Sequence, residues 1–211
     1  MKFPLINPAS QYPTVFFGKF YVPDGGKPIA FYIQHPIEWL VLEIDKKKGR
    51  ALLLSKYILD WEGFANCPIF GYGYETSWGD SYLRSWLNGE FLNESFSSAE
   101  KDLVVPIYNA ASCGNGTRTV DKVFLLSAEE IKKYFASNES AITQSPEIFA
   151  AGQTGDKDSP IIFNFCQHIW WTRTSGATKD LVVCVDHDGT LCEMDSNCDE
   201  IGVRPAMWVK L

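Results

Sequence analysis

Short apolar runs separated by turn residues occupy both ends of the chain and indicate β-strands there. In the first third, these runs cover residues 15–20, 29–33, 39–44 and 50–58. The clearest hairpin joins 39–44 to 50–58, because both runs flank the polar, glycine-terminated connection Asp45–Gly49. Three consecutive leucines at 52–54 predict a strand buried on both faces. In the last third we expect five more strands, over residues 161–165, 169–174, 181–185, 190–194 and 203–209.

Helical spacing appears in the middle of the chain. Residues 81–89 predict a short helix with its apolar side chains on one face, Asp80 as its N-cap and Gly89 as its left-handed exit. Two Ser-x-x-Glu capping boxes predict further helices over about 98–105 and 128–136. The boxes are Ser97 with Glu100 and Ser127 with Glu130.

The order of these elements favours an α+β fold. A strand is expected over 120–126, and residues 137–160 form a long polar connection of the kind that is often functional. Strands at both ends with helices between them do not fit βαβ alternation. We therefore expect mainly antiparallel sheets with about three short helices, in a single domain over residues 1–211, since no repeat or linker divides the chain.

Composition and charge exclude several classes of partner. The 19 basic and 26 acidic residues give a formal charge of −7, which leaves no electrostatic footprint for a phosphate backbone. No window approaches 18 uninterrupted apolar residues, and the N-terminus lacks the pattern of a signal peptide. These observations predict a cytoplasmic protein that binds neither nucleic acid nor membrane, or an extracellular one if a longer sequence has been trimmed. The six cysteines are then expected to be reduced.

Several sequence blocks carry a resemblance to a known family. They occur in order over roughly residues 36–209. The most specific are Trp78-x-x-Ser-x-Leu-Arg-x-Trp-Leu-Asn88 and Gly202-Val-Arg-Pro-Ala206; the others are 36–42, 53–60, 121–127 and 171–174. Together these blocks resemble a bacterial family of uncharacterised domains, which is itself distantly similar to the C-type-lectin-like fold of sulfatase-modifying factors and variable ligand-binding proteins.

The resemblance implies a fold more than an activity. Sulfatase-modifying enzymes use a cysteine pair that binds copper, and related iron enzymes use a histidine triad. The cysteine spacing here does not reproduce the first motif, and His35, His168 and His187 belong to no common motif.

The C-terminal cysteines could also hold a metal or form a disulfide. Cys184, His187, Cys192 and Cys198 are suitable zinc ligands, but their spacing matches no recognised zinc motif. A three-residue loop over 187–189 would pair Cys184 directly with Cys192, whereas a two- or four-residue loop would place them on opposite faces. We expect small buried strand residues here, no metal and no cofactor.

The remaining chemistry points to binding. No nucleophile elbow, phosphate loop or metalloprotease motif is present, so no catalytic residue is assigned. Adjacent Trp170 and Trp171 would point to opposite sides of a strand, which leaves one of them available to face solvent or a groove. Arg173 shares the face of Trp171, where it could stack, form a buried ion pair or contact a ligand.

The leading hypothesis is a non-catalytic module that binds a glycan or a protein through a loop-rich face. The predicted binding residues are Trp171, Arg173, Tyr108, Asn109, Asn115, Arg118 and Gln153. We assign structural roles to Arg84, Trp86, Asn88 and Arg204, and expect the two arginines to pin their elements to carboxylates or carbonyls. Two alternatives are a metal-dependent thiol enzyme of the sulfatase-modifying type, which requires a thiol of lowered pKa, and an assembly domain that docks on another chain.

Overall fold

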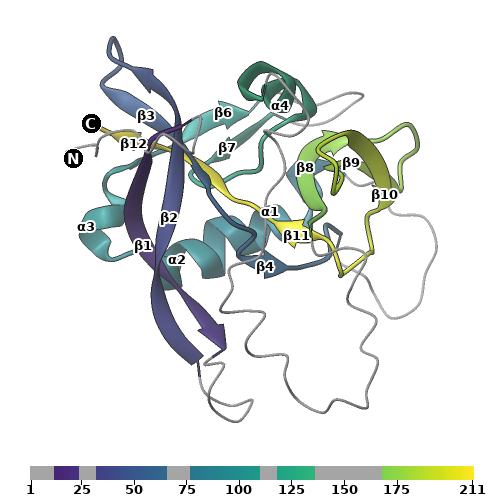
Figure 1. Ribbon diagram of the computed structural model, residues 1–211, viewed down its shortest axis with the longest axis horizontal. Helices are drawn as coiled ribbons and strands as arrows, with labels where there is room; N and C mark the ends of the chain where they lie inside the picture. The colour runs from purple at the N-terminus through teal and green to yellow at the C-terminus, as the bar shows by residue number, and fades with distance from the viewer. Residues whose placement is uncertain (1–11, 24–31, 66–76, 110–117, 136–167) are drawn as a thin grey trace.

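Two five-stranded sheets and a two-stranded ribbon make up the β structure of the described part of the chain (Figure 1). The computed structural model describes residues 12–23, 32–65, 77–109, 118–135 and 168–211. Apart from the β11–β8 pair, the described strand pairs are antiparallel. In Figure 1 the β1–β2 hairpin lies on the left and β8, β9 and β10 on the right, with α1 and α2 between them. The expected α+β class with mainly antiparallel sheets is confirmed.

The first sheet joins the two ends of the described chain. Its order is β1 (Thr14–Pro23), β2 (Tyr32–Asp45), β3 (Arg50–Ser55), β12 (Ala206–Lys210) and β5 (Val104–Val105). The expected hairpin around Asp45–Gly49 is the β2–β3 pair, and Gly49 adopts a φ of 61°. Because β3 is central in the sheet, its three leucines are each at most 1 % exposed, as the apolar run predicted.

The second sheet follows the order β10 (Leu191–Asp195), β9 (Leu181–Val185), β8 (Trp170–Ser175), β11 (Gly202–Val203) and β4 (Asp60–Trp61). The single strand expected over 203–209 is divided into β11 and β12, which belong to different sheets. Arg204 and Pro205 form the passage between them, and the Pro205 carbonyl accepts a hydrogen bond from Ser55 N (2.9 Å). The strand expected over 161–165 lies outside the described residues.

The helical region runs further than the sequence pattern indicated. It contains η1 (Trp78–Asp80), α1 (Tyr82–Trp86), the π-helical turn η2 (Leu87–Phe91) and α2 (Leu92–Ser95). The N-cap of α1 is Ser81 rather than Asp80, and Gly89 does not end the helix. At the wide turn, the Asn88 side-chain amide donates to the carbonyl of Arg84 (3.0 Å), and the helix continues past the glycine into α2.

Both capping boxes are present and open α3 (Ser98–Lys101) and α4 (Ala128–Tyr134). Helix α3 is shorter than expected because β5 leaves it almost at once to pair with β12. The strand expected over 120–126 is also shorter: β7 (Thr119–Asp121) pairs with β6 (Ile107–Asn109). The following residues, Val123–Leu126, are fully buried, and Phe124 forms one isolated bridge to Ala206.

Candidate functional site

A buried carboxylate anchors the β6–β7 ribbon to the helical region. Asp121 is 1 % exposed and accepts four side-chain hydrogen bonds. The donors are Trp78 Nε1 (2.9 Å), Arg84 Nε (2.6 Å), Asn109 Nδ2 (2.7 Å) and Thr119 Oγ1 (2.5 Å). One oxygen bonds Arg84 and the other bonds the remaining three donors, so the charge is compensated inside the protein. We call these five residues the Asp121 cluster.

Asn88 joins the same helix to the segment after β7. Its Oδ1 accepts from the backbone N–H groups of Lys122 (2.8 Å) and Val123 (3.2 Å), and its Nδ2 donates to the Val123 carbonyl (2.8 Å). Trp86 is half-buried on the same helix and packs on Phe91, with ring centroids 5.4 Å apart. The helix, the ribbon and the segment following it are therefore held together by side chains from one short sequence block.

The opposite face of the β6–β7 ribbon is exposed. Tyr108 lies directly across from Val120 in the strand register, and their side chains are 83 % and 52 % exposed. Arg118 is two residues before Val120 and is also exposed. Because side chains alternate along a strand, Tyr108 and Val120 share one face while Asn109 and Thr119 point into the Asp121 cluster. Arg118 directly precedes β7 and adds an exposed charge next to this face. We call Tyr108, Val120 and Arg118 the ribbon face.

The predicted binding residues do not form one surface. Trp171 is fully buried: its Nε1 donates to the Glu62 carbonyl (2.8 Å) and its ring packs on Phe64, with centroids 5.6 Å apart. Sequence reasoning expected one of the pair to face solvent or a groove; Trp170 is also fully buried, so neither ring faces solvent. Both faces of β8 are covered by other elements, which adjacent residues alone do not reveal.

Arg173 is also part of the interior. It is 7 % exposed, and its Nη1 donates to the Leu125 carbonyl (2.6 Å) and the Glu130 carboxylate (2.5 Å). Glu130 in turn belongs to the capping box of α4. Of the predicted binding residues, Tyr108 and Arg118 lie together on the ribbon face and Asn109 lies beneath it; Asn115 and Gln153 lie outside the described residues.

Arg204 is a buried cation held by carbonyls and rings. It is 2 % exposed, and its guanidinium donates to the carbonyls of Ser55 (2.8 Å) and Lys56 (3.3 Å). It also lies over the ring of Trp170, 4.9 Å from the centroid. Burial lowers the pKa of Arg204 to about 9, so the side chain stays charged at neutral pH. Arg204 thus fixes the passage between the two sheets.

Of the C-terminal cysteines, Cys184 and Cys192 lie on β9 and β10, whereas Cys198 follows β10 and lies outside the strands. Cys184 and Cys192 are directly opposite in the β9–β10 register, as the three-residue loop required, and no disulfide joins them. Burial, together with the nearby Asp186 and Asp188, raises the pKa of the Cys192 thiol to about 11. Within the described residues, no three His, Cys, Asp or Glu side chains are grouped as a metal site, and Cys67, Cys113 and Cys166 lie outside them.

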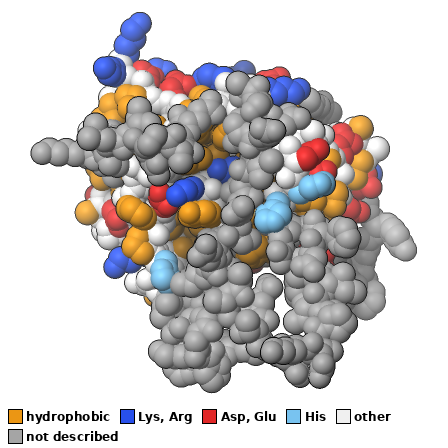
Figure 2. Space-filling view, viewed as in Figure 1, with side chains coloured by type: hydrophobic (Ala, Val, Ile, Leu, Met, Phe, Trp, Pro, Cys, Tyr) orange, Lys and Arg blue, Asp and Glu red, His pale blue; other side chains and the backbone are white. Residues whose placement is uncertain are grey.

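Charges of both signs are interspersed with hydrophobic side chains on the face shown in Figure 2. None of the described helices is long and apolar enough to cross a membrane.

Sequence reasoning missed the roles of Trp78, Thr119 and Asp121. A signal for two of them was available, because Trp78 begins one of the family-like blocks and Asp121 begins another. What the blocks could not show is that their first residues meet, 2.9 Å apart, in one hydrogen bond.

Of three comparisons with known proteins, the one with family models found a match. Neither the curated proteins nor the solved structures contain a match. One family model matches residues 48–211, a range that includes the Asp121 cluster, the ribbon face and Arg204. The chain therefore belongs to the family described as Domain of unknown function (DUF6273).

Proposed function

We propose that this chain is a non-catalytic binding domain that takes a protein ligand on the ribbon face. The observation that carries this proposal is the 83 % exposure of Tyr108 on a ribbon whose other face is fixed by the Asp121 cluster. A large aromatic side chain held out by a rigid support offers contact area at a low cost in conformational entropy.

The composition of the ribbon face favours a protein ligand. Tyrosine and arginine are enriched among residues that dominate binding energy at protein interfaces, and Val120 adds apolar surface between them. A sugar site requires several hydrogen-bonding groups that converge on one ligand. Among the described residues of this face, Arg118 alone supplies a charged hydrogen-bonding group, so a glycan ligand is the second candidate.

A C-type-lectin-like fold remains part of the proposal. It is supported by the Gly202–Ala206 block, which here forms β11, the passage through Arg204 and the start of β12. The thiol-enzyme alternative has less support, because the pKa of Cys192 is raised rather than lowered. The assembly alternative predicts that a second copy of the chain occupies the ribbon face.

Site-specific photo-crosslinking tests the proposal. A benzophenone amino acid replaces Tyr108 in one variant and Ile44, which is 44 % exposed on β2, in a matched control. Both proteins are irradiated in extract of the cells that produce the chain, and adducts are identified by mass spectrometry. We expect one protein adduct at position 108 that is absent at position 44 and is reduced when Arg118→Ala is added.

Three outcomes count against the proposal: the same adducts at both positions, no adduct at 108, or an adduct indifferent to Arg118→Ala. An adduct at 108 with a second copy of the chain would show that the ribbon face binds another copy of this chain instead of a different protein. Binding to a glycan array that is lost in Tyr108→Ala would replace the proposed protein ligand by a glycan.

A further inference from the structure

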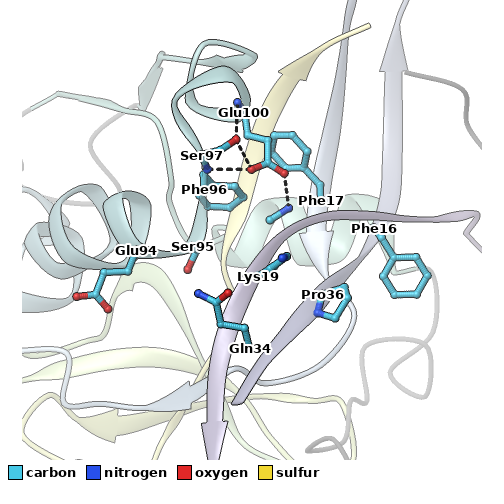
Figure 3. A pocket seen from close by; sticks show the side chains of 11 residues that line it. Phe16, Phe17, Lys19, Gln34, Pro36, Glu94, Ser95, Phe96, Ser97 and Glu100 are labelled. Carbon is cyan, nitrogen blue, oxygen red and sulfur yellow. Dashed lines mark hydrogen bonds between the residues drawn. The ribbon is translucent and has the colours of Figure 1, made fainter. Parts of the chain in front are cut away.

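A pocket of about 450 Å³ lies between β1, β2 and the segment that joins α2 to α3 (Figure 3). Its volume falls within the range of about 300–1,000 Å³ that is usual for small-molecule sites. The lining residues used below are Phe16, Lys19, Pro36, Glu94, Ser95 and Glu100. None of them belongs to the ribbon face, so this site is independent of the function proposed above.

An irregularity in the strand register forms one wall of the pocket. The pairing of β1 with β2 shifts between Phe16 and Lys19, and Gly18 there adopts a φ of 69°. The Gly18 N–H donates to Glu100 Oε1 (3.2 Å), and Glu100 Oε2 accepts from Ser97 N (2.8 Å) and Ser97 Oγ (2.7 Å). Burial opposes ionisation, but these hydrogen bonds outweigh it and lower the pKa of Glu100. The wall is therefore fixed by an ionised carboxylate.

Ser95 supplies the polar group that indicates a ligand. The residue is 4 % exposed, it lines the pocket, and its Oγ has no hydrogen-bond partner within the described part of the chain. A buried hydroxyl without a partner costs about 1–3 kcal/mol, a cost that a bound acceptor would remove.

Charged, hydroxyl and apolar side chains occupy different parts of the pocket. Figure 3 shows Glu94 at one end, Ser95 and Lys19 in the middle, and Pro36 and Phe16 towards the other end. Phe16 is 67 % exposed, so its ring is open to contact. The order is thus an anionic group, then a hydroxyl with a cationic group, then an apolar surface.

We propose that this pocket binds a free α-amino acid with an apolar side chain, such as leucine or phenylalanine. The ligand ammonium faces Glu94, its carboxylate faces Lys19 and accepts from Ser95 Oγ, and its side chain lies against Pro36 and Phe16. Two carboxylates and one ammonium group line the pocket, but Glu100 already accepts hydrogen bonds from Gly18 and Ser97. Glu94 and Lys19 are then the charged groups left for a ligand, and they match one that carries one charge of each sign. A purely anionic ligand would face Glu94, and a purely cationic one would face Lys19.

Titrations monitored by NMR test this proposal on the full chain. The backbone amides of Gly18 and Ser95 serve as reporters, and leucine or phenylalanine is added to about 10 mM, ten times a dissociation constant of about 1 mM. We expect saturable shifts at both amides. Ser95→Ala should weaken leucine binding about fivefold or more without lowering the stability of the fold, because it removes a hydroxyl that has no partner.

Ligand analogues separate the two charged contacts. Lys19→Gln should weaken leucine binding about tenfold but should not weaken the binding of leucinamide, which has no carboxylate and is itself a cation. Glu94→Gln should weaken leucine binding but should not weaken the binding of N-acetyl-leucine, which has no ammonium group and is itself an anion. Tyr108→Ala is the matched control and should leave leucine binding unaltered.

Each alternative outcome overturns the proposal. Absence of shifts with both amino acids excludes the ligand class, and shifts with glucose in place of leucine assign the pocket to sugars. Equal weakening of leucine and leucinamide by Lys19→Gln excludes the proposed orientation. A leucyl dipeptide that binds as tightly as leucine, with the same response to Lys19→Gln, would assign the pocket to peptide ends instead of free amino acids.

Discussion

Three charged side chains in the described part of the chain, Asp121, Arg204 and Asp60, have different partners. Asp121 receives an arginine and three further donors, whereas Arg204 is held by backbone carbonyls and an aromatic ring. Asp60, on β4, accepts a hydrogen bond from the Trp61 N–H (2.9 Å), and burial with the nearby Glu62 raises its pKa to about 6. We therefore expect opposite effects when the charges of Asp121 and Asp60 are removed.

Asp121→Asn should destabilise the fold. The new amide keeps one acceptor oxygen but turns an –NH₂ group towards donors that need a lone pair, and it leaves Arg84 without its counter-charge. We expect a loss of about 3 kcal/mol in the free energy of unfolding by urea. Asp102→Asn, at an exposed position, is the control and should change stability by less than about 0.5 kcal/mol. An Asp121→Asn variant as stable as this control would contradict a central role for the cluster.

Asp60→Asn should stabilise the fold at neutral pH. The pKa of Asp60 is raised in the folded state, so the native protein binds the proton more tightly than the unfolded chain. Stability then falls as pH rises from about 3.8 to about 6 and stays reduced above that range. The asparagine carries no charge and keeps an oxygen for the Trp61 N–H. We expect the free energy of unfolding of Asp60→Asn, relative to that of the natural chain, to be about 2 kcal/mol higher at pH 7.5 than at pH 4. If the variant and the natural chain differ by the same amount at both pH values, the effect is excluded.

At the scale of elements, three glycines differ in their backbone conformation and in what surrounds them. Gly89 lies inside the π-helical turn, and a Cβ added there meets nothing within 4 Å. Gly18 and Gly49 both have positive φ, but a Cβ at Gly18 would lie 2.4 Å from Phe96 whereas one at Gly49 meets nothing within 4 Å. The same substitution, glycine to alanine, should therefore have three different results.

Gly89→Ala should raise stability by about 0.5–1 kcal/mol, because alanine fits the helical conformation and restricts the unfolded chain. Gly49→Ala should cost about 1 kcal/mol for the left-handed backbone alone. Gly18→Ala should cost more, about 2–4 kcal/mol, since the clash with Phe96 is added. Thermal or urea unfolding of the three variants checks the order. Equal costs at Gly18 and Gly49 would show that Phe96 yields without penalty.

The same elements show how far the sequence could predict the fold. Capping boxes at Ser97 and Ser127 were correctly placed because their groups lie three residues apart. The continuation past Gly89 was not predictable, since it accompanies a contact of Asn88 with Val123, 35 positions away. Likewise Trp171 is covered by the region of Glu62, 109 positions away. For the site, the sequence pattern did not predict that Tyr108 lies on β6 and that Arg118 directly precedes β7. The burial of Trp171 and Arg173 was not predictable either, because it depends on which elements pack around β8.

At the scale of the whole molecule, the range of the family match does not include the first two strands of the first sheet. The matched range begins at residue 48, yet β2 lies before it and pairs with β3 along most of that strand. Trp39 on β2 is fully buried, and its Nε1 donates to the Phe17 carbonyl (2.7 Å) on β1. Phe17 in turn packs on Phe96, with ring centroids 5.2 Å apart, so the hairpin contributes to the core around α2.

A fragment of residues 48–211 should therefore fail to fold alone. Without β2, the central strand β3 becomes an edge, and the surface that Trp39 and Phe17 cover is exposed to water. We expect the fragment to lack the near-ultraviolet circular dichroism and the cooperative urea transition of the full chain. Addition of the separate fragment 1–47 should restore both signals, which distinguishes loss of the hairpin from damage to the rest of the chain. If residues 48–211 alone unfold cooperatively with native near-ultraviolet dichroism, they form a domain that is stable without the first two strands. The pocket beside Gly18, which those strands line, would then lie outside that domain.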